Sequence, residues 1–279
     1  MALDAYKMLI NGQWVDAADG GSFESVDPSN NTPWATVPEA TEADIDAAVK
    51  AAHYAQTQGP WSTMTPSQRG KHLGKLGDLL AENSEHLGRI ETRDTGKMFK
   101  ETAWQAKYIA EYFHFFAGAA DKISGETLPI DKPDMFVFTK REPLGVVAAV
   151  VPWNSQLFLV AVKIGPALAA GNTVVLKASE HASAAMLEFG ELIEQAGFPP
   201  GVVNYVTNAP EDAAAVVEAM VAHPAVRRVN FTGSRGGSIV GGTDELGYKA
   251  EQSPYHLRDV HATLLHLLGL DQKQLNFLH

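Results

Sequence analysis

The chain has 279 residues, of which 45% are hydrophobic, and it carries a formal net charge of −11 with no cysteine. This length and hydrophobic content allow a buried core and indicate a globular protein of one large or two ordinary domains. The acidic charge excludes the attraction to phosphate backbones that drives nonspecific nucleic-acid binding, and the lack of cysteine excludes disulfides and thiolate metal sites and fits a cytoplasmic protein.

No secretory signal and no membrane segment are predicted. Residues 1–10 contain no basic stretch followed by an apolar core. The apolar stretch 146–162 is long, but Pro152, Trp153 and Asn154 interrupt it. This pattern is typical of a buried strand, a turn and a helix, so a membrane is not expected as a partner.

The first elements are predicted from local signals. Asn11-Gly12 within 9–15 indicates a β-hairpin, and a turn is expected over 26–30. A helix beginning at Thr41 is predicted by one apolar face, which consists of Ile45, Ala48, Val49 and Ala52. Thr65-Pro66-Ser67-Gln68 is a capping box with proline at the first helical position, so a second helix begins there.

Two further helices are expected over 84–93 and 102–119. The second of them carries aromatic residues at helical spacing: Trp104, Tyr108, Tyr112, Phe115 and Phe116. A helix face of this kind is commonly buried, so this stripe is predicted to belong to the core and not to a ligand site.

From residue 123 onward the pattern changes to extended chain and then to alternating strands and helices. Residues 123–145 are predicted to be extended, with Phe136 and Phe138 alternating with their neighbours. Strands rich in small and β-branched residues are expected over 146–151, 173–177, 202–206 and 228–232. Strands joined by helical connections imply a parallel sheet, so the predicted fold class is α/β.

Three motifs follow the ends of these strands. They are Val151-Pro152-Trp153-Asn154, Lys177-Ala178-Ser179-Glu180 and Phe231-Thr232-Gly233-Ser234. In this order they resemble the aldehyde dehydrogenase family over residues 1–234. The resemblance implies an NAD-binding domain with an incomplete Rossmann-like parallel sheet flanked by helices, and a projecting β-ribbon over 123–145 that serves the family in oligomerisation. Residues 235–279 are then an unrelated tail with one amphipathic helix.

Lys177 and Glu180 are the predicted ribose ligands. Glu180 follows a parallel strand, where a carboxylate can accept hydrogen bonds from both hydroxyls of an adenosine ribose and so favour NAD over NADP. The resemblance places Lys177 at the same ribose and adds Ser179, Val151, Pro152 and Trp153 to the cofactor site. The alternative interpretation is a solvated Lys and Glu in an ordinary loop.

Gly233 and Ser234 are the predicted pyrophosphate ligands. By resemblance they lead into a helix whose amino terminus faces the anion, a favourable geometry for phosphate. The residues that follow differ from the family. They include four glycines that each lower helix propensity by about 1 kcal/mol relative to alanine, namely Gly236, Gly237, Gly241 and Gly242. Binding of NAD is therefore expected to be weak.

Asn154 matches the asparagine that stabilises the oxyanion in the family. Such a donor contributes about 3 kcal/mol to a transition state. The resemblance also implies a cysteine nucleophile, a glutamate base and a substrate domain beyond residue 234, and the chain has no cysteine. The alternative is an asparagine that only forms the turn after Pro152.

The tail has a separate interpretation. Residues 242–250 and 259–271 resemble the carboxyl end of a bacterial sulfatase-like family. His256, His261 and His266 recur every five residues, which on a helix does not bring them together, so no metal site is predicted.

The prediction for function is a truncated oxidoreductase that binds NAD with little or no aldehyde oxidation, because a covalent mechanism needs a thiolate. A homo-oligomer is expected from the ribbon. One alternative is a self-associating interaction protein that pairs through the ribbon around Phe136 and Phe138 and an unfinished sheet edge. Another is an unrelated hydrolytic activity built from serine and histidine residues.

Overall fold

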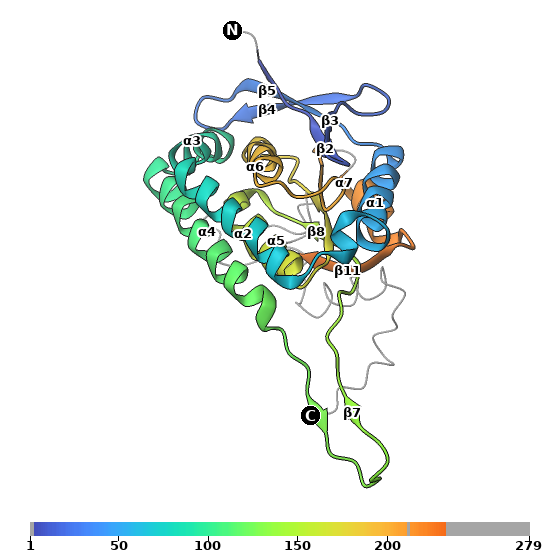
Figure 1. Ribbon diagram of the computed structural model, residues 1–279. Coiled ribbons are helices and arrows are strands. Elements are labelled where there is room, and N and C mark those ends of the chain that lie inside the picture. The colour runs from blue at the N-terminus through green and yellow to red at the C-terminus, as the bar shows by residue number, and fades with distance from the viewer. Residues whose placement is uncertain (1–2, 211–212, 233–279) are drawn as a thin grey trace, which may run out of the picture.

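A six-stranded sheet forms the centre of the protein (Figure 1). The structure is a computed structural model and describes residues 3–210 and 213–232. The strand order is β11-β8-β9-β10-β2-β3. The four parallel strands are β8 (Val146–Val150), β9 (Thr173–Lys177), β10 (Val203–Val206) and β11 (Val226–Phe231). The predicted α/β fold with a parallel sheet is confirmed.

The N-terminal hairpin extends this sheet. Strands β2 (Met8–Ile10) and β3 (Gln13–Val15) pair with each other, and β2 lies antiparallel to β10. Asn11 and Gly12 both have positive φ, 54° and 70°, as a type I′ turn requires. The Asn-Gly signal thus predicted the hairpin correctly, while its pairing with β10, far away in the chain, depends on tertiary contacts.

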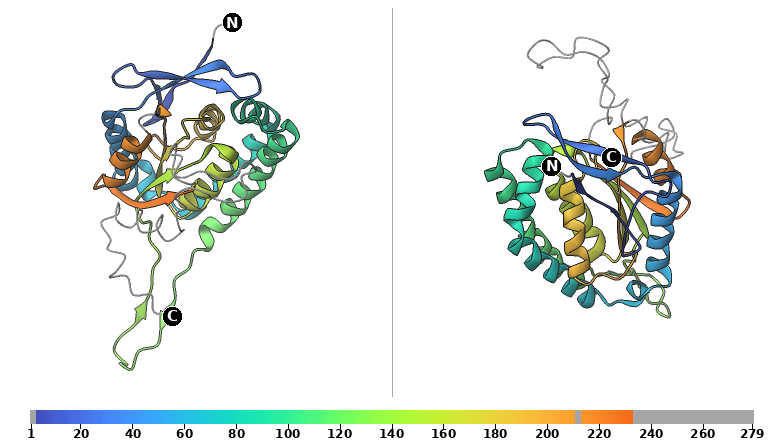
Figure 2. Two further views of the ribbon diagram at one scale, coloured as in Figure 1. Left: turned by 180° about the vertical axis from the view of Figure 1, so that it is seen from behind. Right: turned by 90° about the horizontal axis from the view of Figure 1, so that it is seen from above.

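Helices cover both faces of the sheet (Figure 2). Helices α1 (Glu42–Thr57) and α7 (Ala213–Ala222) pack on one face, and α5 (Gln156–Ala169) and α6 (Ala184–Gln195) pack on the other. Alternate strand residues divide between two cores: Val147 and Ala149 belong to the α5 side, and Val146 and Ala148 to the α1 side. Because both faces are buried, β8 and the middle of β9 are continuous apolar runs, whereas β11 at the edge of the sheet contains Arg227, Arg228 and Asn230.

Three further helices form an outer layer beyond α5 and α6. They are α2 (Pro66–Glu82), α3 (Ser84–Thr95) and α4 (Phe99–Ala119). The predicted capping box begins α2, where Gln68 N donates to Thr65 Oγ1 at 3.3 Å and Thr65 N donates to Gln68 Oε1 at 2.8 Å. Short 3-10 helices occupy Pro60–Thr63, Ala120–Lys122 and Trp153–Ser155.

Two smaller sheets complete the described chain. Strands β1 (Asp4–Ala5), β5 (Thr32–Pro38) and β4 (Ser22–Asp27) form a three-stranded sheet at the N-terminal end. Strands β6 (Thr127–Leu128) and β7 (Val137–Phe138) form a ribbon that projects from the opposite end of the body (Figure 1). No helix among residues 3–210 and 213–232 is long and apolar enough to cross a bilayer.

The predicted core role of the aromatic stripe on α4 is wrong for three of its five residues, while Tyr112 and Phe116 do pack against the core. Trp104 is 62% exposed, Tyr108 45% and Phe115 65%, while Tyr112 and Phe116 are only partly buried. The buried face of α4 consists of Thr102, Ala106, Ile109, Ala110 and Phe113. Both faces have helical spacing, so periodicity alone could not choose between them. This face is turned inward because Thr102, Ala106 and Ala110 let α4 pack closely against α2 and α3, while Ile109 and Phe113 fill the core.

Gly88 shows how close this packing is. A Cβ on Gly88 would lie 2.7 Å from the backbone N and Cα of Ala103 on α4, whereas a Cβ on Gly118 would meet nothing within 4 Å. We expect Gly88→Ala to lower the free energy of unfolding by about 1–3 kcal/mol through overpacking. The control Gly118→Ala should raise it by up to about 1 kcal/mol, since alanine is the better helix former. Urea unfolding of both variants measures the difference, and equal effects would contradict the close contact between α3 and α4.

Candidate functional site

The ends of three parallel strands meet at one edge of the central sheet. Val151 N donates to the carbonyl of Lys177 at 3.2 Å, and Thr232 N donates to the carbonyl of Val150 at 3.2 Å. The segments that follow β8, β9 and β11 therefore adjoin at their carboxyl ends. In open α/β sheets, ligands bind in the crevice outside this edge.

The turn after β8 presents an exposed surface at this edge. The Val151 side chain is buried in the core and leaves its backbone at this edge. Trp153 and Asn154 are exposed within the 3-10 helix Trp153–Ser155, and Pro152 is half-buried. Helix α5 begins directly after this turn.

Lys177 and Glu180 form a buried ion pair at the end of β9. The ammonium donates to Glu180 Oε2 at 2.7 Å, and the two side chains are 4% and 5% exposed. This burial contradicts the alternative of a solvated loop pair. Burial lowers the pKa of Lys177, and Glu180 partly offsets this effect. Burial alone would raise the pKa of Glu180, but the charge and hydrogen bond of Lys177 outweigh it and lower that pKa overall.

Ser179 lies between these two residues and is also buried. Its carbonyl accepts a hydrogen bond from Ser183 Oγ at 2.7 Å, and it forms an isolated β-bridge with Ala182. These contacts fix the backbone of the turn after β9 and so hold the Lys177–Glu180 pair in place.

Lys163 is a charged residue near this edge that was not predicted from the sequence as a site residue. It lies on α5 and donates to Thr232 Oγ1 at 2.7 Å and to Asn230 Oδ1 at 2.9 Å. Burial lowers its pKa to about 8. The signal in the sequence was a lone cation within the otherwise apolar stretch 157–169. Lys163 thus joins α5 to the end of β11 at this edge.

Gly233 and Ser234 lie outside the described residues, as does the whole predicted tail 235–279 with its helix and histidines. Among the described side chains, no group of three or more His, Asp or Glu is arranged to hold a metal ion. The site therefore consists of the turn 151–155, the segment 177–180 and the end of β11.

Comparison with known proteins identifies two parts of the chain. Residues 14–241 match the model of the aldehyde dehydrogenase family. Residues 232–279 match a family described as Protein of unknown function (DUF1501). The two matches overlap over residues 232–241, close to the boundary at Ser234 predicted from the sequence.

Curated relatives match the same region. The chain is 51% identical over 231 residues to (Z)-2-((N-methylformamido)methylene)-5-hydroxybutyrolactone dehydrogenase of Acinetobacter baylyi, covering 83% of this chain and 46% of that protein. It is 43% identical over 229 residues to aldehyde dehydrogenase family 2 member C4 of Arabidopsis thaliana, covering 82% and 45%. The chain thus spans about half the length of the curated relatives it matches.

Solved structures agree in fold. An NAD+ complex of aldehyde dehydrogenase from Bacillus cereus is 41% identical with a TM-score of 0.79, over 83% of this chain and 46% of that one. An NADP dependent enzyme from E. coli is 30% identical with a TM-score of 0.82, over 95% and 50%. With the sheet edge, the order of the motifs and these matches in agreement, the chain belongs to the aldehyde dehydrogenase family.

Proposed function

We propose that this chain binds NAD at the edge formed by β8, β9 and β11 and does not oxidise aldehydes through a covalent intermediate. The observation that carries the proposal is the buried Lys177–Glu180 pair, with its 2.7 Å contact at the carboxyl end of β9. A carboxylate at this place accepts from the two ribose hydroxyls, and the ammonium beside it donates to the same ribose. The relative from Bacillus cereus in an NAD+ complex supports this ligand.

We propose the other cofactor contacts from the position of the turn 151–155 at this edge and from the family motifs, since Gly233 and Ser234 lie outside the described residues. Pro152, Trp153 and the backbone of Val151 form the wall beside the nicotinamide end, Ser179 holds the turn beneath the ribose, and Gly233 and Ser234 bind the pyrophosphate. When bound, NAD supplies a hydride acceptor. We expect weak affinity, because the glycines after Ser234 oppose the helix that would face the phosphates.

The lack of cysteine decides the catalytic part of the proposal. A thioester needs a thiolate, and none of the 279 residues can supply it. Asn154 is exposed in the turn and could stabilise an oxyanion, yet a single donor does not replace the nucleophile. The chain is accordingly proposed to be a truncated, NAD-binding member of its family, fused to a tail of different origin, with a cytoplasmic location.

Titration calorimetry with NAD and NADP, beside absorbance of NADH during incubation with a panel of aldehydes, tests this proposal. We expect heat from NAD, at least tenfold weaker binding of NADP because Glu180 repels a 2′-phosphate, and no NADH above the blank. Absence of NAD binding would refute the cofactor part. Sustained NADH production would refute the inactive part.

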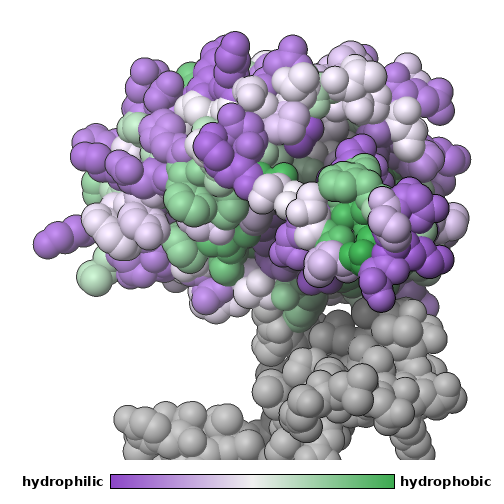
Figure 3. Space-filling view, turned by 60° about the horizontal axis from the view of Figure 1, so that its bottom comes forward, coloured by the Kyte–Doolittle hydropathy of each residue, from purple (hydrophilic) through white to green (hydrophobic). Residues whose placement is uncertain are grey.

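Self-association is a second candidate function, and the ribbon and the sheet edge favour it. Phe136 is 76% exposed and Phe138 62%, and among the described residues β11 pairs only with β8, so its outer edge is open. The body seen from below also carries apolar patches among polar and charged side chains (Figure 3). Contiguous exposed apolar surface and open sheet edges are typical of association sites.

Replacing Phe136 and Phe138 by serine tests this candidate. We expect the wild-type chain to sediment as an oligomer and the double variant to shift toward the monomer. Tyr54→Ser, a similarly exposed aromatic on α1, is the matched control and should leave the distribution unchanged. A wild-type monomer at high concentration would contradict self-association.

The remaining interpretations draw less support. In the described part, the hydrogen bonds and ion pairs of the histidine rings are with Ala196, Glu188, Asp78, Asp46, Ala225 and Glu180, and none is with a serine hydroxyl. A hydrolytic site and the sulfatase-like origin of the tail therefore stay predictions.

A further inference from the structure

A buried carboxyl group on α3 lies against the start of α5. The Glu91 side chain is fully buried, and neither of its oxygens has a hydrogen-bond partner. The backbone N–H groups of Gln156 and Leu157, the first residues of α5, are nevertheless close enough to influence its ionisation. A buried carboxyl without partners is rare in a folded protein and calls for an explanation.

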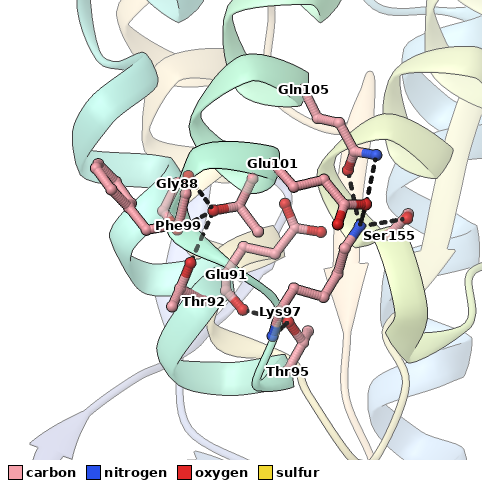
Figure 4. Close-up of polar contacts among 10 residues, drawn as sticks. Gly88, Glu91, Thr92, Thr95, Lys97, Phe99, Glu101, Gln105 and Ser155 are labelled. Carbon is pink, nitrogen blue, oxygen red and sulfur yellow. Dashed lines mark hydrogen bonds and ion pairs between the residues drawn. The ribbon is translucent and has the colours of Figure 1, made fainter.

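The start of α5 has no side-chain cap of its own. Ser155 occupies the N-cap position but makes no capping hydrogen bond. Its hydroxyl instead accepts from Lys97 Nζ at 3.0 Å, and the same ammonium contacts Gln105 at 3.0 Å and Glu101 at 2.9 Å (Figure 4). Glu91 is thus the carboxyl beside the first N–H groups of α5, at a helix N-terminus where a negative charge is favourable.

The ionisation of Glu91 falls in the physiological range. Burial raises its pKa to about 7, while Lys97 and the two N–H groups of α5 act in the opposite direction and Asp94 adds slightly to the rise. Lys97 from the loop before α4 and Asp94 from α3 are the charged groups with the largest influence on it. The carboxyl is thus mostly neutral at pH 6 and mostly charged at pH 8.

We infer that Glu91, together with Lys97, is a positioning residue that holds the start of α5 and thereby fixes the turn 152–155. This turn carries Trp153 and Asn154, so its geometry controls the cofactor side of the crevice. The inference rests on the proposed function for its ligand, and on the geometry of α3, Lys97 and α5 for its mechanism.

Glu91→Gln tests the inference, since it keeps the shape and removes the charge. Titration of the full chain with NAD should give about fivefold weaker binding than wild type at pH 8 and equal binding at pH 6, an effect typical of one charge at a helix N-terminus. Glu85→Gln, the same change on the exposed side of α3, is the matched control and should follow wild type at both pH values. The titration of Lys163 affects variant and wild type alike, so it does not change the ratio of their affinities for NAD. An equal affinity ratio at both pH values would overturn the inference.

Hydrogen exchange without NAD keeps this test separate from the proposed function. In Glu91→Gln at pH 8, amides within 152–158 should exchange at least fivefold faster, while those of α2 keep their wild-type rates. Unchanged exchange over 152–158, or faster exchange throughout the chain, would overturn the positioning role. If wild type fails to bind NAD while this local effect is present, the proposed function fails and the positioning role stands.

Discussion

Replacing Glu180 by alanine is expected to lower the free energy of unfolding by about 3–5 kcal/mol and to abolish NAD binding. The reason is Lys177, whose side chain is 4% exposed and whose ammonium has Glu180 as its ion-pair partner at 2.7 Å. Removing one partner of a buried pair leaves an uncompensated charge in a medium that solvates it poorly. Urea unfolding at pH 7 measures the loss.

The pH dependence of this variant has a definite sign. Burial already lowers the pKa of Lys177 in the folded protein, and Glu180 is the group that raises it again. Without Glu180 the pKa of Lys177 falls further below its unfolded value, so the folded state releases its proton more readily. The deficit should therefore shrink as the pH rises toward 10.

A double variant separates stability from binding. Lys177→Met with Glu180→Leu replaces the pair by apolar side chains of similar size, which is often neutral for stability. We expect it to regain most of the lost stability and still not bind NAD. A double variant that binds NAD, or a single variant that loses less than about 1 kcal/mol, would contradict the role given to this pair.

Local signals in the sequence were reliable where the chain itself determines the structure. The Asn11-Gly12 turn and the capping box at Thr65 depend on neighbouring residues, and both are present. The four parallel strands were also correct, because apolar strands alternating with helices admit few topologies. The three-stranded sheet of β1, β5 and β4 was not predicted, since β1 has only two residues and the longer β4 and β5 contain acidic residues and prolines that weaken the strand pattern.

The site was only partly predictable. Its motifs follow strand ends, so their meeting at one edge could be expected from the parallel sheet. Lys163 and Glu91 could not be assigned, because their roles depend on which helix faces them. On α3 the buried positions include Glu91 and Asp94, so the inward face of this helix is partly charged and hydrophobic periodicity does not reveal it. The prediction for the aromatic stripe of α4 failed for a related reason, because the neighbouring helices determine which face of α4 is buried.

Glu91→Gln is expected to raise the free energy of unfolding at pH 8 by about 1–3 kcal/mol and to change it little at pH 5. Burial places the pKa of Glu91 at about 7 in the folded protein, above its ordinary value of 4.5. A carboxyl with a raised folded-state pKa contributes most below its unfolded pKa, and this contribution is lost as the pH rises from 4.5 to 7. A difference of one between the folded and unfolded pKa corresponds to about 1.4 kcal/mol, which sets the upper limit of the gain.

Urea unfolding of wild type and Glu91→Gln at pH 5 and pH 8 measures this gain. Asp94→Asn is the matched comparison: burial also raises the pKa of Asp94, to about 6, but its carboxylate accepts from Ser25 Oγ at 2.6 Å and from Ala184 N at 2.9 Å. Because the amide forfeits part of these contacts, Asp94→Asn should gain less than Glu91→Gln. A loss of stability in Glu91→Gln at pH 8 would contradict the raised pKa. Glu91→Gln could gain global stability and at the same time exchange faster over 152–158. This combination would mean that the charged carboxyl maintains the geometry of the turn and lowers the stability of the fold. A purely structural role for Glu91 does not produce it.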